Sequence, residues 1–134
     1  MRGALGDALI KLLDRSGKDG WPPIKRIILE TTGVAEPGPI LRELSAAPEL
    51  QGRVRADGTT TLVDAAVGAD TPARQGIARA QVAAAAQLLI SKADLVAPAP
   101  PAALNEQLRA LNPEPATAPA QQAAAKPSHR PGAA

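Results

Sequence analysis

Apolar residues recur along this chain at helical spacing in some segments and as short runs in others. The first helix is predicted near the N-terminus from a single apolar face made by Leu5, Ala8, Leu9, Leu12 and Leu13. The turn formers from Gly17 to Gly20 predict its end. A run rich in β-branched residues predicts a strand at 24–30. Further strands are predicted at 54–64, with a break near Asp57-Gly58, and at 88–90, where a short apolar run indicates a buried strand.

Three more helices are predicted between and after these strands, at 37–44, 74–87 and 102–111. Pro37 and Pro39 open the first of them, because proline is well tolerated in the first turn of a helix. Strands that alternate with helices indicate an α/β fold with a partial parallel sheet and flanking helices.

The composition changes after Asn112. Residues 113–134 are rich in proline and alanine and show no apolar periodicity, which predicts a disordered C-terminal tail. We therefore expect one partial domain at 1–112 and a tail at 113–134.

Composition narrows the function classes. The chain has 134 residues, no cysteine and one aromatic residue, Trp21, so leucine, isoleucine and valine must build the core. A net charge of +2 predicts no nucleic-acid partner. The absence of a signal-like segment and of a run of about 18 apolar residues predicts a cytoplasmic protein without a membrane span. With one histidine, His129, and no thiolate, we expect no tight zinc site.

The first candidate site follows the apolar run at 27–29. Glu30, Thr31, Thr32 and Gly33 place a carboxylate and two hydroxyls where a strand ends, and ligands of α/β sheets bind at such ends. A carboxylate there can hold Mg²⁺ or orient a water, and glycine lets a phosphate approach the backbone. The alternative, a plain turn with a threonine cap, is equally compatible with these four residues.

A second candidate site, Ser91-Lys92-Ala93-Asp94, follows the strand predicted at 88–90. Asp94 can accept two hydrogen bonds from the edge of guanine, and the stem of Lys92 can lie over the base. Ser91 keeps a hydroxyl where the better-known form has asparagine or threonine. Asp64 ends the preceding strand, and we favour a turn-capping role for it over a role in the same crevice. The alternative for residues 91–94 is a solvated turn. The position of this loop after a buried strand favours a binding site instead.

One motif that usually accompanies such nucleotide sites, the phosphate-binding loop, is missing. No glycine-rich loop that ends in Lys-Ser or Lys-Thr, the usual phosphate cradle, occurs in the chain.

The order of these motifs resembles one family. Glu30 to Pro37 resembles the E-T-T-G-x-A-x-P signature of the CobW-like (G3E) P-loop GTPases. Further matches follow in the family's order, at Thr61 to Ala65, Gln81 to Val96 and Leu111-Asn112-Pro113. The alternative is a urease- or hydrogenase-accessory GTPase, because these proteins share the architecture. They do not share the E-T-T-G-x-A-x-P signature.

The resemblance implies an incomplete P-loop NTPase fold that binds GTP or GDP with Mg²⁺. Glu30 would be the acidic residue near magnesium and water, Thr31, Thr32 and Gly33 would lie beside the nucleotide, and Ser91, Lys92 and Asp94 would bind guanine. Members of the family are chaperones or insertases for zinc or cobalt, or cobalamin-pathway factors, so a metalloprotein client is implied. The metal and the client are not specified by the sequence.

The departures from the family predict a fragment. The family's phosphate-binding loop and its C-x-C-C motif are absent, so we expect a truncated product in which Met1 is an internal methionine and GTPase activity is in question. A non-enzymatic remnant that pairs with a partner is the alternative. The missing strand would leave an open sheet edge and favour self-association.

Overall fold

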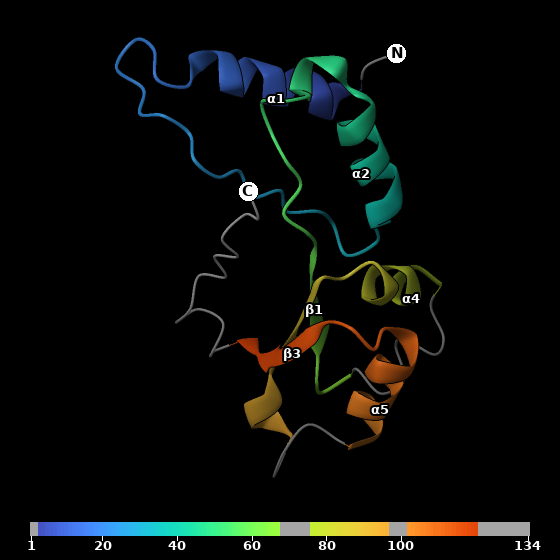
Figure 1. Ribbon diagram of the computed structural model, residues 1–134. Helices are drawn as coiled ribbons and strands as arrows, with labels where there is room; N and C mark the ends of the chain where they lie inside the picture. Colours follow the sequence, from blue (N-terminus) through green and yellow to red (C-terminus); the bar gives the residue numbers. More distant parts are fainter. Residues whose placement is uncertain (1–2, 68–75, 97–101, 121–134) are drawn as a thin grey trace. The chain divides into compact units, whose positions relative to one another are not determined.

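The computed structural model describes residues 3–67, 76–96 and 102–120 (Figure 1). The chain divides into two compact units, Met1–Asp57 and Gly58–Ala134.

The first unit is helical. It contains α1 (Ala4–Arg15), α2 (Pro37–Ala46) and the short 3₁₀ helix η1 (Pro48–Leu50). The predictions of α1 and α2 are confirmed, with proline in the first turn of α2. Leu50 is the most buried side chain of this unit, at 1% exposure. Glu43 of α2 accepts a hydrogen bond from the backbone N–H of Gly6 in α1, at 3.4 Å.

The strand predicted at 24–30 does not form. Residues 21–32 have no regular secondary structure, and the side chain of Ile28 is 86% exposed. A β-strand is stable only when a neighbouring strand takes up its backbone hydrogen bonds, and no described segment pairs with this run. The strand predicted from this pattern is therefore wrong.

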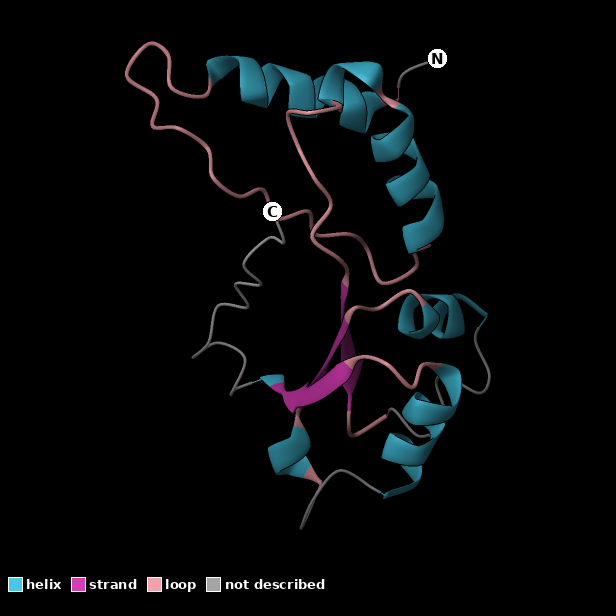
Figure 2. Ribbon diagram, viewed as in Figure 1, coloured by secondary structure: helices cyan, strands magenta, loops and turns pink. Residues whose placement is uncertain are grey.

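The second unit holds a three-stranded parallel sheet in the order β1-β2-β3 (Figure 2). Its elements in chain order are β1 (Thr60–Asp64), α4 (Gly76–Ala83), β2 (Gln87–Ser91), the 3₁₀ helix η2 (Ala93–Leu95), α5 (Ala102–Leu111) and β3 (Ala116–Pro119). The parallel α/β prediction is confirmed. β1 is shorter than predicted, and Gly58, which precedes it, has a positive φ of 122°. The predicted helix 74–87 ends at Ala83, and residues 68–75 lie outside the described residues.

The disorder predicted from Pro113 onward is wrong for β3, which pairs with β2. Leu89 of β2 lies opposite Ala118, and Ile90 lies opposite Pro119. Proline lacks the N–H that a central strand must donate, but an edge strand tolerates it. Residues 121–134 lie outside the described residues, so the prediction for them is untested.

The core of the second unit lies between the sheet and one helical layer. Figure 1 shows α4 and α5 on the same side of the sheet. The buried residues that fill this space are Val63, Ala65, Val82, Ala85, Leu88, Ile90, Leu104 and Leu108. Leu62, which alternates with Val63 along β1, is 63% exposed. Among the described residues the sheet is therefore packed on one face only.

Asn112 joins the two helices of this layer. Its side-chain amide donates to the carbonyls of Val82 and Ala85, both at 2.9 Å, and to that of Ala83 at 3.2 Å. Its backbone N–H donates to the carbonyl of Leu108 at 2.9 Å. The last carbonyls of a helix have no partner within the helix. Asn112 thus follows the last residue of α5, and its side chain donates hydrogen bonds to the backbone carbonyls at the end of α4.

None of the helices in the described residues is long and apolar enough to cross a membrane.

We expect Asn112→Ala to lower the free energy of unfolding by about 1–3 kcal/mol, because it removes the hydrogen bonds that the side-chain amide donates to the carbonyls at the end of α4. Urea denaturation followed by circular dichroism measures this change. Asn105→Ala is the matched control, and its effect should stay within about 0.5 kcal/mol. Equal losses in the two variants would contradict the capping role.

Candidate functional site

The carboxyl ends of β1 and β2 lie side by side. Asp64 and Ser91, the last residues of the two strands, are register partners. The backbone N–H of Ala65 continues the ladder by donating to the carbonyl of Ser91 at 2.9 Å. The loop 91–94 therefore starts beside Asp64, and the predicted place of this loop after a buried strand is confirmed.

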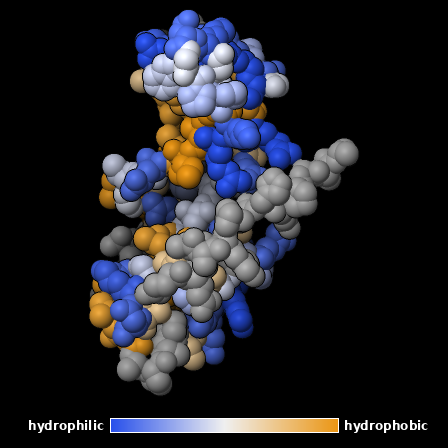
Figure 3. Space-filling model, turned by 90° about the vertical axis from the view of Figure 1, so that its left-hand side faces the viewer, coloured by the Kyte–Doolittle hydropathy of each residue, from blue (hydrophilic) through white to orange (hydrophobic). Residues whose placement is uncertain are grey.

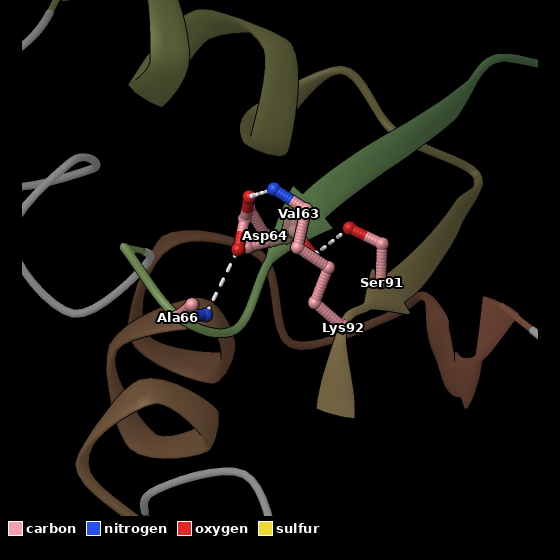
Figure 4. Close-up of polar contacts among 5 residues, drawn as sticks. All are labelled: Val63, Asp64, Ala66, Ser91 and Lys92. Carbon is pink, nitrogen blue, oxygen red and sulfur yellow. Dashed lines mark hydrogen bonds and ion pairs between the residues drawn. The ribbon is translucent and has the colours of Figure 1, made fainter. Parts of the chain in front are cut away.

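The carboxylate of Asp64 contacts both the turn that follows β1 and the side chain of Lys92 (Figure 4). Oδ1 accepts a hydrogen bond from the backbone N–H of Ala66 at 2.9 Å, which is the turn-capping role favoured from the sequence. Oδ2 lies 2.5 Å from Nζ of Lys92. Asp64 therefore also belongs to the strand-end edge.

The electrostatics follow from these contacts. The hydrogen bond from Lys92 lowers the pKa of Asp64, and the N–H of Ala66 lowers it further, while partial desolvation opposes both. The carboxylate is thus ionised throughout the neutral range.

Lys92 has an unusual backbone. Its φ of 55° and ψ of 27° are left-handed, a conformation that costs most L-residues about 1–2 kcal/mol. The chain then enters η2, where the N–H of Leu95 donates to the carbonyl of Lys92 at 3.1 Å. The hydroxyl of Ser91 donates to the carbonyl of Val63 at 3.4 Å. Asp94 is exposed in η2, and its predicted recognition of guanine stays a prediction.

Glu30, Thr31, Thr32 and Gly33 lie in the first unit, and all four are exposed. The carbonyl of Thr32 accepts a hydrogen bond from the N–H of Ala35 at 3.0 Å, which closes a turn. A Cβ added at Gly33 would meet no atom within 4 Å. The turn expected as the alternative is therefore present, and the predicted contacts of these residues with nucleotide stay predictions.

The two candidate sites belong to different units, since the division of the chain falls between Asp57 and Gly58. The structure brings Asp64, Ser91 and Lys92 together in one unit and forms the turn after Glu30 in the other. Within the described ranges, no three histidine or acidic side chains group in a way that holds a metal ion.

A shallow hollow lies beside the strand ends but contains none of the predicted site residues. It is lined by Ile90, Asn105, Arg109, Thr117, Ala118 and Pro119. No motif in the sequence pointed to it.

The pairing of Asp64 with Lys92 was not predicted. The available signal was that Asp64 is the last residue of one predicted strand and that Lys92 closely follows the next. The sequence does not show the register that brings them together.

Comparison with known proteins identifies similar sequences and folds. The family model of the CobW/HypB/UreG nucleotide-binding domain matches residues 1–119. The zinc chaperone YjiA of Escherichia coli is 39% identical over 109 residues, covering 81% of this chain and 33% of YjiA. The crystal structure of the Zn(II)-bound YjiA GTPase from E. coli aligns with a TM-score of 0.71 at 34% identity, over 81% of this chain and 33% of that chain. The chain spans about one third of the length of these relatives.

We expect Asp64→Asn to reduce stability at neutral pH, and this difference from the wild type to shrink in acid. The lowered pKa means that the stabilisation by the carboxylate is complete above its ordinary value of about 3.9 and is lost as the pH falls through the folded-state pKa. Thermal melts of both proteins between pH 7 and pH 2 measure this. A difference that stays constant over the whole range would contradict the assignment.

Proposed function

The chain belongs to the CobW/HypB/UreG nucleotide-binding domain family, and on this basis we propose that the loop 91–94 of the second unit is the base-binding part of a guanine-nucleotide site. The observation that supports this most is the loop 91–94, whose lysine is paired with Asp64 at the carboxyl edge of the parallel sheet. This edge is where α/β sheets bind their ligands.

The base is bound by the second unit in this proposal. The exposed carboxylate of Asp94 accepts hydrogen bonds from the two donors on the guanine edge, which adenine does not present. The stem of Lys92 lies over the ring, and the hydroxyl of Ser91 ties the loop to β1 through the carbonyl of Val63.

For the turn in the first unit, taken by itself, we propose contacts with phosphate and Mg²⁺ on the basis of the family resemblance. Glu30 orients a water molecule or contacts the phosphates through Mg²⁺. Thr31 and Thr32 provide hydroxyl groups that can contact the nucleotide. The open space at Gly33 fits close approach of a phosphate to the backbone. When GTP is bound with Mg²⁺, the ion would neutralise charge on the phosphates.

The biological role proposed for the chain is metal handling as part of a longer protein. The similar protein YjiA is named a zinc chaperone, which favours zinc over a role in cobalamin synthesis. A metalloprotein client is the implied partner, and the expected location is the cytoplasm. Since the chain has no cysteine, thiolate ligands for the metal must come from outside these 134 residues.

A second candidate function, association without catalysis, is favoured by exposed apolar surface. Figure 3 shows hydrophobic surface among hydrophilic residues on the face that it presents. Ile28 is 86% exposed in the first unit and Leu62 is 63% exposed in the second. Within the described residues the outer edge of β1 has no neighbouring strand. An unpaired edge with an exposed leucine favours pairing with another copy or a partner.

We expect the wild-type chain to prefer GDP to ADP, and Asp94→Ala to weaken GDP binding by about tenfold or more. Hydrogen bonds to a charged group are worth about 1.5–3 kcal/mol. Titration calorimetry with both nucleotides measures this. Asp14→Ala, which removes an exposed aspartate of the first unit, is the control and should bind GDP like the wild type. Equal affinity of the wild type for GDP and ADP would contradict the assignment of the loop.

We expect the 134-residue chain to hydrolyse GTP very slowly. Phosphoryl transfer depends on positioning and charge stabilisation, and loss of one preorganised donor costs about 10²–10³ in rate. The sequence contains no lysine-bearing phosphate cradle. A version extended upstream by such a loop should turn over GTP, and Glu30→Ala should abolish this activity. Rapid Mg²⁺-dependent turnover by the chain itself would contradict the proposal.

A further inference from the structure

The ion pair between Asp64 and Lys92 connects two strand ends that are far apart in sequence. The two residues are separated by 28 positions, and their atoms lie 2.5 Å apart. Their meeting follows from the parallel register, which places Asp64 opposite Ser91. The carboxylate is itself fixed, because Oδ1 is bound to the N–H of Ala66.

The backbone of Lys92 directs its side chain toward this carboxylate. With φ at 55°, the residue turns the chain into η2, and Figure 4 shows its side chain extending from the end of β2 to Asp64. A lysine without a partner samples many rotamers, because its charge sits on a flexible stem of four methylene groups. Here both ends of the stem are held, one by the backbone and one by the ion pair.

The held stem is still accessible. The side chain of Lys92 is 55% exposed, while that of Asp64 is 30% exposed. A lysine whose ammonium group is fixed presents its methylene groups as a small apolar surface. Such a surface suits the face of a planar ring.

We infer that Asp64 is a positioning residue for the base-binding loop: it holds the ammonium group of Lys92 so that the lysine stem forms a preorganised support for the purine ring. The inference rests on the proposed guanine site and assigns Asp64 a role in it. Asp64 acts through Lys92 and does not touch the base.

The test is a double-mutant cycle on GDP binding by the full 134-residue chain. Asp64→Asn keeps an oxygen for the N–H of Ala66 and removes the charge that holds Lys92. We expect it to weaken GDP binding about two- to fivefold, the range for exposed ion pairs, and to shift the backbone amide resonances of residues 91–95 without nucleotide. In a Lys92→Ala background, Asp64→Asn should cause no further loss. Asp64→Glu should restore part of the affinity.

Asp14→Asn is the matched control, since it breaks an exposed ion pair with Arg53 of 2.7 Å in the first unit. It should leave GDP binding unchanged. The inference is overturned if Asp64→Asn has no effect, or if it weakens binding equally with and without Lys92, because the latter indicates a purely structural turn.

The failure of the proposed function has a different signature. A chain that does not distinguish GDP from ADP, and in which Asp94→Ala changes nothing, lacks the guanine site. In that case the ion pair does not position Lys92 for a base. The inference then fails together with the proposed function, even if the resonances of residues 91–95 shift. A normal effect of Asp94→Ala without coupling between Asp64 and Lys92 overturns the inference alone.

Discussion

The parallel register between β1 and β2 is the constraint on which the second unit depends. It pairs Thr60 with Gln87 at one end and Asp64 with Ser91 at the other. The same register places Val63 opposite Ile90, both facing the buried side. Because side chains alternate along a strand, a slip of one residue would turn this apolar pair outward and separate Asp64 from Lys92. The burial of the core and the geometry of the candidate site are therefore specified together.

Segments whose stability is mainly local or strongly periodic were predicted well from the sequence. The bounds of α5 are those predicted, because Leu104 and Leu108 lie one turn apart and both are buried. The strand at 88–90 was also predicted, and the structure extends it by one residue at each end to Gln87 and Ser91. In these segments apolar spacing and burial agree, so the sequence carries the signal directly.

Segments that depend on a distant partner were predicted poorly. The apolar run at 24–30 has the composition of a strand but no pairing neighbour among the described residues, so its backbone stays irregular. The segment 116–119 lies in the region predicted to be disordered but pairs with β2. Pairing, rather than composition, decides both cases. The same limit applies to the site: the sequence suggested Ser91, Lys92 and Asp94 from their spacing, whereas the contact of Lys92 with Asp64 depends on register.

The left-handed backbone conformation of Lys92 distinguishes the loop 91–94 from most other turns in the described residues. The described residues other than glycine with positive φ are Asp19 and Lys92. Asp19 lies in a turn between Gly17 and Gly20, and a short polar side chain tolerates the left-handed region through local hydrogen bonds. Lysine has no such local compensation, so its backbone cost must be offset by contacts elsewhere, and the ion pair with Asp64 is one of them. Strain at a residue that the surrounding structure holds in place is characteristic of functional sites. In this protein the strained residue, Lys92, is also the one that the sequence motif predicts to lie over the base. The strand-end edge of the second unit is therefore a better candidate for ligand binding than the exposed hollow beside α5.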